Sequence, residues 1–335
     1  MNRKIKNILV TGGAGFIGSA FIRKVIKDNV FFGNVVNFDL LTYAADLRHL
    51  AEVENDSRYR FVHGDICNEV LIADVCRDFD IDTIVHFAAE SHVDRSIASP
   101  IDFCRTNVEG TLHLLEVIRK KPHIHIHHVS TDEVYGSLGP EGSFSETSNI
   151  FPNSPYAASK AASDHFVRAY VNTYGISATI SHCSNNYGPC QNEEKFIPKM
   201  IKSLDEGKML PIYGQGLNIR DWLYVEDHVE AIIEILLNGR RGETYDIGGG
   251  YEAPNIDIVH KIIDLFSQIS GRNRSDLLNL VSFVPDRLGH DFRYSIDSSK
   301  IQKELGWVAS HSFEEALTKT IHWYLSSNNL EYSKD

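Results

Sequence analysis

The fold is decided by the stretch N-I-L-V-T-G-G-A-G-F-I-G, which runs from Asn7 to Gly18. Its first five residues form a short apolar run rich in β-branched side chains, which is typical of a buried parallel strand. Gly12, Gly15 and Gly18 follow in the spacing G-x-x-G-x-x-G, and a helix is expected from Phe16 to about Lys27. A strand, a tight glycine turn and a helix N-terminus present backbone N–H groups and a helix dipole to a pyrophosphate. The stretch therefore predicts a dinucleotide-binding unit.

An acidic residue further along indicates which dinucleotide binds. The run Val35–Phe38 predicts a second strand, and Asp39 follows it directly. In such a unit a carboxylate about twenty residues beyond the glycines binds the adenosine ribose hydroxyls and repels a 2′-phosphate. Asp39 therefore favours NAD over NADP, and the two features together are far more specific than the glycines alone.

Strands and helices continue to alternate. Further strands are expected at 58–63, 83–87, 124–129 and 245–249, a strand end with a polar turn at 181–189, and helices at 68–79, 107–120, 199–206 and 256–270. This alternation predicts an α/β fold with a Rossmann-type doubly wound parallel sheet. We expect an NAD-binding domain over residues 1–180, with return segments near 219–250. Residues 181–330 should mainly form a smaller α/β substrate-binding domain.

Reactive side chains are concentrated in S-T-D-E-V-Y-G (Ser130–Gly136) and Y-A-A-S-K (Tyr156–Lys160). The first segment follows a predicted strand, so it lies at the carboxyl end of the sheet, where ligands bind in open α/β folds. Ser154 and Pro155 predict a helix start, which places Tyr156 and Lys160 on one helix face. An ammonium group favours the anionic form of a neighbouring phenol, so Tyr156 is a candidate base.

The same region holds a pair of adjacent acids. Asp132 and Glu133 are a candidate acid and a candidate base, provided that their surroundings separate their pKa values. With Thr131, Tyr156 and Lys160 they would converge on one pocket. The alternative is an ordinary strand-end turn followed by an ordinary helix N-terminus.

Composition excludes several classes of protein. The 335 residues are 42% hydrophobic and 23% charged, with a formal net charge of −12, which argues against a nucleic-acid or membrane-surface binder. The five cysteines are scattered without a C-x-x-C pair, which suits a reducing cytosol rather than a disulfide framework or a zinc site. No signal peptide or membrane span is recognised, so a cytoplasmic location is expected.

Basic residues in the C-terminal half offset the negative charge locally. Lys195, Arg220 and Arg287 would suit a diphosphate ligand, and the planar fork of Arg220 makes it the favoured phosphate partner. The alternative is a solvated run of charge. Four histidines, at 123, 125, 127 and 128, lack an acid or cysteine at metal-ligand spacing, so they are interpreted as strand residues and no metal site is expected.

These motifs resemble those of the extended short-chain dehydrogenases/reductases, and within them the dTDP-glucose 4,6-dehydratase family. The resemblance runs from about Lys6 to Tyr324. G-x-x-G-x-x-G and Y-x-x-x-K specify only the superfamily, which includes epimerases and reductases. T-D-E (131–133), N-N-Y-G-P (185–189), N-I-R-D-W-L-Y-V-E-D-H (218–228) and D-R-x-G-H-D (286–291) are more selective. Family members are usually homodimers joined by a helix bundle, which here implies the helices near 107–120 and 157–174.

The resemblance also implies which residues form the site. Catalytic roles fall on Thr131, Asp132, Glu133, Tyr156 and Lys160. NAD contacts fall on Gly12, Gly15, Phe16, Ile17, Gly18, Asp39, Leu40, Leu41, Thr42, Asp65, Ile66, Ala88, Ala89, Glu90, Ser91, His92, Thr106, Tyr156, Lys160 and Asn186. Sugar-nucleotide contacts fall on His92, Thr131, Asn185, Lys195, Phe196, Pro211, Ile212, Tyr213, Arg220, Asn255, Asp286, Arg287, Leu288, Gly289, His290 and Tyr294.

The implied reaction converts dTDP-glucose to dTDP-4-keto-6-deoxyglucose and water, as in deoxysugar (rhamnose-type) biosynthesis. Tyr156 would remove the 4-hydroxyl proton while tightly bound NAD accepts a hydride from C4. Lys160 would lower the pKa of the phenol and Thr131 would hold the 4-oxygen. Glu133 would then take the proton from C5, Asp132 would protonate the departing 6-hydroxyl, and the hydride would return to C6.

Three alternatives remain open on sequence grounds. A UDP-glucose 4,6-dehydratase would use the same chemistry, and Phe196, Leu288 and Asn192-Glu193 depart from the family pattern beside the nucleotide pocket. A UDP-sugar 4-epimerase has no need of the Asp132–Glu133 pair. A non-catalytic NAD-sensing protein has no need of Tyr156 and Lys160.

Overall fold

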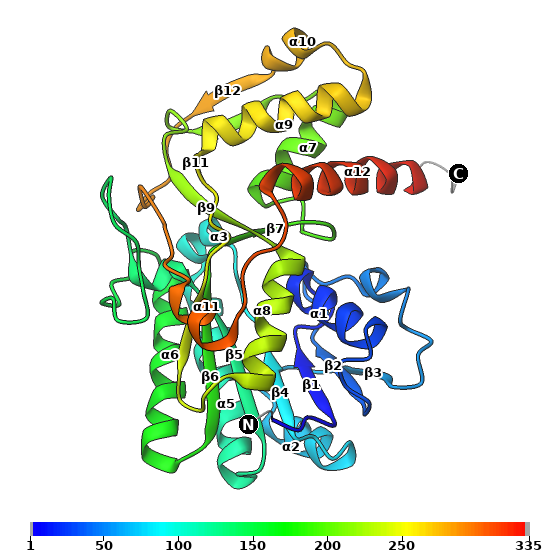
Figure 1. The fold of residues 1–335 in the computed structure, drawn as a ribbon, viewed down its shortest axis with the longest axis vertical. Helices are drawn as coiled ribbons and strands as arrows, with labels where there is room; N and C mark the ends of the chain where they lie inside the picture. The colour runs from blue at the N-terminus through cyan, green and yellow to red at the C-terminus, as the bar shows by residue number, and fades with distance from the viewer. Residues whose placement is uncertain (1–2, 332–335) are drawn as a thin grey trace.

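The structure is a computed structural model that describes residues 3–331. Its centre is a seven-stranded sheet in the order β10-β6-β5-β4-β1-β2-β3, in which every pair is parallel (Figure 1). The strands are β1 (Ile8–Thr11), β2 (Val35–Asp39), β3 (Tyr59–His63), β4 (Thr83–His86), β5 (His125–Thr131), β6 (Ser177–Cys183) and β10 (Thr244–Ile247). Chain order runs in one direction from β1 to β3 and in the other from β4 to β6, so the predicted doubly wound sheet is confirmed.

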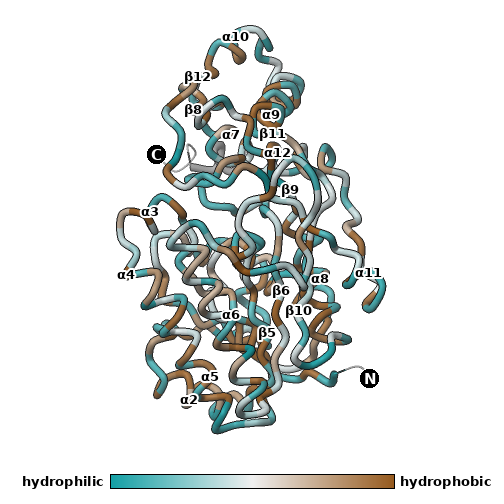
Figure 2. The backbone as a smooth tube through the Cα atoms, turned by 90° about the vertical axis from the view of Figure 1, so that its left-hand side faces the viewer, coloured by the Kyte–Doolittle hydropathy of each residue, from teal (hydrophilic) through white to brown (hydrophobic). Residues whose placement is uncertain are grey.

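Helices cover both faces of this sheet. They are α1 (Phe16–Lys27), α2 (Glu69–Asp78), α3 (Val93–Ala98), α4 (Pro100–Phe103), α5 (Gly110–Lys120), α6 (Pro155–Tyr174), α8 (Val225–Asn238) and α11 (Ser299–Leu305). Figure 2 shows α5 and α6 on one side of β5, β6 and β10, with α8 on the other. Because both faces are covered, every residue of β1, β2, β4 and β5 is buried, as is typical of parallel sheets.

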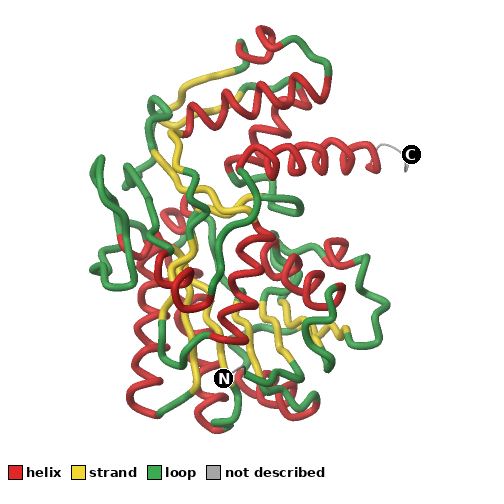
Figure 3. Tube along the Cα trace, viewed as in Figure 1, coloured by secondary structure: helices red, strands yellow, loops and turns green. Residues whose placement is uncertain are grey.

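A second group of elements lies beyond the carboxyl edge of the large sheet. It comprises β7 (Asn185–Tyr187), β9 (Ile219–Tyr224) and β11 (Glu252–Pro254) in one sheet, β8 (Leu210–Tyr213) and β12 (Val281–Val284) in another, and α7 (Phe196–Glu206), α9 (Asn255–Ser270), α10 (Arg274–Leu278) and α12 (Phe313–Glu331). Figure 3 shows these helices and short strands together at one end of the molecule. The small sheets thus hold β7, β8 and β9 beyond the carboxyl ends of the large sheet's strands.

The expected polar turn within 181–189 is wrong. Asn185–Tyr187 instead forms β7, which pairs in parallel with β9. Tyr187 is buried and its ring packs against the rings of Trp222, Tyr224 and Phe313. These partners come from distant parts of the chain, so the polar local sequence gave no sign of the strand.

Most other predicted elements are confirmed within one or two residues. The helix expected at 107–120 is longer, because a π-helical turn, η2 (Cys104–Glu109), precedes α5. Ser154 caps α6 as its sequence predicts, since its Oγ accepts a hydrogen bond of 3.0 Å from the N–H of Ala157. Short 3₁₀ helices, η1 (Leu47–Leu50) and η3 (Asp132–Tyr135), complete the described elements of this half.

Three of the four histidines are buried strand residues. His125 and His127 each lie within hydrogen-bonding distance of hydroxyl groups on β6, from Ser177, Thr179 and Ser181. His128 faces α6, while His123 is exposed and precedes β5. Within residues 3–331 no group of three or more His, Cys, Asp or Glu side chains is placed to hold a metal ion.

Gly12 is held at a close approach between two strand ends. Its φ is +70°, and an added Cβ would lie 2.6 Å from the backbone nitrogen of Ala88. We expect Gly12→Ala to lower the free energy of unfolding by about 1–3 kcal/mol, because the left-handed conformation and the contact both oppose a side chain. Denaturant titration measures this loss. Gly139→Ala is the control, since its Cβ would meet no atom within 4 Å. Equal losses of unfolding free energy in both variants would show that the close approach of Gly12 to Ala88 is not the cause.

Candidate active site

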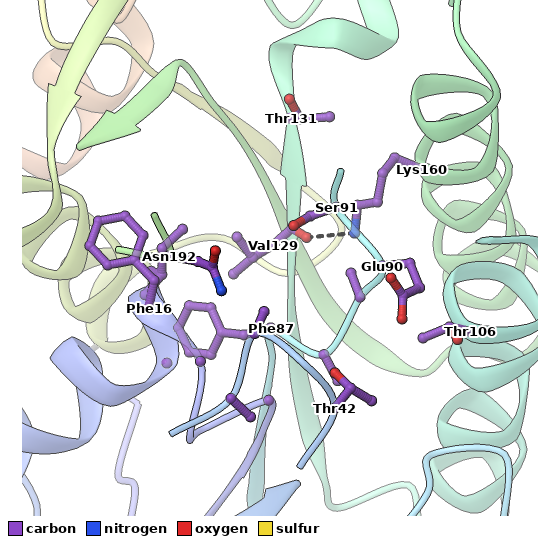
Figure 4. A pocket seen from close by; sticks show the side chains of 18 of the residues that line it. Phe16, Thr42, Phe87, Glu90, Ser91, Thr106, Val129, Thr131, Lys160 and Asn192 are labelled. Carbon is purple, nitrogen blue, oxygen red and sulfur yellow. Dashed lines mark hydrogen bonds between the residues drawn. The ribbon is translucent and has the colours of Figure 1, made fainter. Parts of the chain in front are cut away.

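A cavity of about 530 Å³ lies at the carboxyl edge of the large sheet. Figure 4 shows Phe16 and Asn192 on one side, Glu90 and Thr106 on the other, and Thr131 and Lys160 near one end. Of the predicted NAD contacts, the lining includes Gly12, Gly15, Phe16, Ile17, Gly18, Asp39, Leu40, Thr42, Asp65, Ile66, Ala88, Ala89, Glu90, Ser91, Thr106, Tyr156, Lys160 and Asn186. Leu41 and His92 are not in this lining. The cavity therefore joins the glycine turn to the region of Tyr156.

The glycine turn has the shape that a pyrophosphate requires. The N–H of Gly15 donates to the carbonyl of Gly12 over 3.2 Å, and a Cβ on Gly18 would lie 2.3 Å from the same oxygen. α1 begins at Phe16, so its free N–H groups and its dipole point to the cavity. These residues fit a dinucleotide.

Asp39 organises the adenosine end of the cavity. Its Oδ2 accepts a hydrogen bond from the N–H of Ala14 at 2.9 Å, and its Oδ1 accepts one from Leu41 at 2.8 Å. A carboxylate oxygen has further lone pairs, so Asp39 can also accept hydrogen bonds from ribose hydroxyls. Leu41, which does not line the cavity, contributes here through its backbone.

The five candidate catalytic residues meet at the other end of the cavity. Thr131 ends β5, Asp132 and Glu133 begin η3, and Tyr156 and Lys160 lie in the first two turns of α6. All five line the cavity. The Thr131 Oγ1 accepts a hydrogen bond of 3.3 Å from the N–H of Glu133, which fixes the turn that carries both acids.

The surroundings of the two carboxyl groups differ. Burial, and then the negative charges of Glu133 and Asp221, raise the pKa of Asp132 well above its usual value. Burial also raises the pKa of Glu133, but the positive charges of Arg220 and Lys195 oppose that effect. Asp132 is therefore the group that retains a proton more readily, and Glu133 is the one that ionises more readily, as an acid and a base require.

Lys160 was expected to lower the pKa of Tyr156, and this expectation is wrong for this structure. The Lys160 Nζ donates to the carbonyl of Val129 at 2.9 Å (Figure 4). Burial, and then the charge of Glu133, raise the pKa of Tyr156 well above 10. The helix spacing correctly placed both side chains on the cavity. It could not show that the Lys160 ammonium binds the carbonyl of Val129, or that the charge of Glu133 disfavours a phenolate at Tyr156.

The predicted basic residues surround Glu133, where each one already has a protein partner. Lys195 donates to the carbonyl of Ser91 at 2.7 Å, and Arg287 lies 2.6 Å from Asp94. The guanidinium of Arg220 is buried, donates to three backbone carbonyls and lies 4.3 Å from the ring centroid of Tyr294. Arg220 is therefore rigidly placed, whereas Arg287 and Lys195 can exchange a protein partner for an anion.

The predicted sugar-nucleotide contacts fall into two groups. Thr131, Asn185 and Lys195 line the cavity. The others, outside its lining, are His92, Phe196, Pro211, Ile212, Tyr213, Arg220, Asn255, Asp286, Arg287, Leu288, Gly289, His290 and Tyr294. Tyr213, Arg287 and His290 lie together, with 5.1 Å from the guanidinium and 6.1 Å from the imidazole to the tyrosine ring centroid. Ile212 is fully buried.

Several lining residues had not been predicted. They are Ala44, Ala45, Asp102, Arg105, Gln191 and Glu194 among others, while Asn192, expected beside the nucleotide pocket, also lines the cavity. Glu194 closes the rim, because its carboxylate accepts a hydrogen bond of 2.9 Å from Tyr43 and lies 3.7 Å from His92. The position of Glu194 beside Lys195 was the one available signal, since loops carry no periodic pattern.

Comparison with known proteins gives a consistent result. The family model described as GDP-mannose 4,6 dehydratase matches residues 9–320. A dTDP-glucose 4,6-dehydratase of Escherichia coli is 49% identical, with 97% of this chain and 94% of that relative covered. A probable dTDP-glucose 4,6-dehydratase of Sinorhizobium fredii is 50% identical, with coverage of 96% and 93%.

Solved structures agree with the sequence relatives. The dTDP-glucose 4,6-dehydratase DesIV of Streptomyces venezuelae, crystallised with NAD bound, superposes with a TM-score of 0.90 at 46% identity, covering 97% of this chain and 98% of that one. A UDP-glucose 4-epimerase of Thermotoga maritima superposes with a TM-score of 0.85 at 26% identity, covering 96% and 99%. The doubly wound sheet and the tyrosine–lysine pair on its cavity are those of the extended short-chain dehydrogenases/reductases. Within this class, the chain belongs to the dTDP-glucose 4,6-dehydratase family.

Proposed function

We propose that this protein is an NAD-dependent dTDP-glucose 4,6-dehydratase, a lyase of deoxysugar biosynthesis. One observation carries the proposal: Thr131, Asp132 and Glu133 at the end of β5 and Tyr156 and Lys160 on α6 line a single cavity. A dehydratase must both oxidise a hydroxyl group and eliminate water, so it needs a carboxyl pair beside the oxidation site. A 4-epimerase needs only the oxidation site.

The two parts of the chain have separate binding roles in this proposal. Residues 1–180, with the return segments near 219–250, bind NAD, and residues 181–330 mainly bind the sugar nucleotide. The glycine turn and Asp39 support the first role. The cluster of Tyr213, Arg287 and His290 supports the second, because a guanidinium and an aromatic ring suit a phosphate and a base.

The residues of the cavity then have the following roles. Bound NAD would supply the acceptor for the C4 hydride and the donor of that hydride to C6, and its positive charge would favour the phenolate form of Tyr156. Tyr156 removes the 4-hydroxyl proton, Lys160 binds the cofactor's ribose, and Thr131 holds the 4-oxygen. Glu133 takes the proton from C5, and Asp132 gives its proton to the departing 6-hydroxyl, which leaves as water. Glu133 then returns the proton to C5 when the hydride reaches C6. The raised pKa of Asp132 keeps that proton available at neutral pH.

Product analysis tests the proposal. Incubation of the purified protein with dTDP-glucose, and separately with UDP-glucose, should release one water from dTDP-glucose without added reductant and give a 4-keto-6-deoxy sugar by NMR. The UDP sugar should react more slowly. A product of unchanged mass would indicate an epimerase, and no reaction by folded, NAD-loaded protein would favour a binding protein.

We also propose a homodimer joined through α5 and α6. Phe166 and Tyr174 on α6 and Ile101 on α4 are large apolar side chains that remain exposed in the single chain. Phe166→Glu should therefore shift sedimentation towards the monomer, whereas a matched change at Phe32, which is exposed elsewhere, should not.

We further propose that the protein acts in the cytoplasm, since all five cysteines are unpaired. Among residues 3–331 no helix is long and apolar enough to cross a membrane.

A further inference from the structure

A chain of buried polar side chains lies next to the catalytic residues. It consists of Tyr135, Asp246, His182, Asp164 and Ser130, and none of these side chains belongs to a residue more than 5% exposed. The Tyr135 hydroxyl donates to Asp246 Oδ1 at 2.9 Å, and His182 Nδ1 lies 3.1 Å from the same oxygen. His182 Nε2 lies 3.1 Å from Asp164 Oδ2, which also accepts a hydrogen bond of 2.9 Å from the Ser130 hydroxyl.

Charge fixes the direction of each bond in this buried chain. Burial lowers the pKa of His182, but its hydrogen bonds with Asp164 and Asp246 outweigh burial and raise the pKa to about 10. Burial raises the pKa of Asp164, yet His128 and His182 beside it hold the pKa well below its usual range. The raised pKa favours an imidazolium, which can donate to a carboxylate on each side, and its Nδ1 also lies 2.7 Å from the Tyr135 hydroxyl. Such a bridge in a dry interior is rigid, because a displaced partner would leave a buried charge unpaired.

The members of the buried chain are distributed over the three segments that carry the catalytic residues. Ser130 directly precedes Thr131 on β5. Tyr135 belongs to η3, the turn that begins with Asp132 and Glu133. Asp164 lies one helical turn beyond Lys160 on α6. His182 on β6 and Asp246 on β10 complete the connection from two neighbouring strands.

We propose that this buried chain is a positioning device, which holds the Asp132–Glu133 turn, the end of β5 and the start of α6 in one fixed arrangement for catalysis. The inference deepens the proposed function and rests on it. Tyr135 and His182 are buried and lie outside the described cavity lining, and neither belongs to the predicted substrate contacts. Their removal should change the rate of the chemical steps and leave binding of the sugar nucleotide intact.

Tyr135→Phe is the most conservative test. It removes one hydroxyl group and keeps the ring, which stacks on Phe144 with centroids 5.1 Å apart. Displacement of a catalytic group by about 1 Å costs a factor of about 100, so we expect kcat to fall by about 10- to 100-fold with KM nearly unchanged. The rate is expressed per NAD-loaded site and measured well below the melting temperature, so that a loss of folded protein does not lower the measured kcat.

Tyr245→Phe is the matched control. Tyr245 is equally buried, is adjacent to Asp246 on β10, and its hydroxyl lies 3.2 Å from the carboxylate of Glu304. The same deletion therefore removes a similar bond on the other face of the strand, away from the catalytic turn. We expect a lower melting temperature with kcat retained.

A second pair of variants tests the imidazolium. His182→Asn should lower kcat at least as much as Tyr135→Phe, because an amide cannot donate to both Asp164 and Asp246 as the imidazolium does. His127→Asn is its control, since His127 is fully buried on β5 but faces only Thr179 and Ser181. If His182→Asn does not fold, the kcat of Tyr135→Phe alone tests the positioning role.

The outcomes are distinct. Loss of kcat in Tyr135→Phe with retention in Tyr245→Phe supports the positioning role. Wild-type kcat in Tyr135→Phe, or equal losses in Tyr135→Phe and Tyr245→Phe, would overturn it while leaving the proposed function standing. A wild-type protein that does not dehydrate dTDP-glucose would overturn both.

Discussion

Tyr156→Phe is expected to lower the rate of C4 oxidation by about 100- to 10,000-fold, the range that loss of a general base produces. The phenol is the only proposed acceptor for the 4-hydroxyl proton, and the phenylalanine ring keeps the apolar packing of Tyr156 against Phe103. Binding of the sugar nucleotide should be retained, because the side chains of the Tyr213, Arg287 and His290 cluster are unchanged. Single-turnover absorbance of the reduced nicotinamide measures the oxidation step directly.

Tyr170→Phe is the control for this variant. Tyr170 lies on the same helix, and its hydroxyl donates to Glu116 at 2.6 Å, outside the described lining of the cavity. Its removal should leave the rate unaltered. Oxidation at the wild-type rate in Tyr156→Phe would exclude Tyr156 as the base.

Asp132→Asn is expected to block elimination while C4 oxidation continues. The amide has nearly the same shape as the buried carboxyl group, but it cannot give a proton to the departing 6-hydroxyl. Turnover should fall by about 100- to 10,000-fold, and reduced nicotinamide should accumulate on the enzyme. If none is detected during slow turnover, Asp132 is not the acid.

Glu133→Gln separates the roles of the two acids. In Asp132→Asn, Glu133 is still present, so the C5 hydrogen of bound sugar should exchange with deuterium from heavy water. In Glu133→Gln that exchange should stop. Exchange that persists without Glu133 and ceases without Asp132 would reverse the two assignments.

Local pattern predicted most strands of the large sheet and several of the helices, whereas α8, β9 and the elements after residue 270 were not predicted. The β-branched run before Gly12 and the run Val35–Phe38 predicted the first two strands of the large sheet. Ser154 and Pro155 predicted the start of α6. These signals depend only on neighbouring residues. β7 was missed, since Tyr187 is held by rings from β9 and from residue 313. The π-helical turn before α5 was missed as well, for it has no sequence signature.

The candidate site shows the same division between local and distant information. Sequence spacing brought Tyr156, Lys160 and the Asp132–Glu133 pair to one cavity. It did not predict the pKa values of these groups. The pKa of Tyr156 depends on burial and on the charge of Glu133, which lies 23 positions earlier in the chain. The buried bridge of His182 was invisible for that reason too: its two carboxylates come from α6 and β10.

The most direct measurement follows deuterium from C4 of dTDP-glucose. The proposed reaction moves that hydrogen within one enzyme-bound sugar, so dTDP-[4-²H]glucose should give a product with deuterium in the C6 methyl group and none released to solvent. NMR of the product locates the label. Deuterium that remains at C4, or that is lost to water, would contradict the proposed dehydratase reaction.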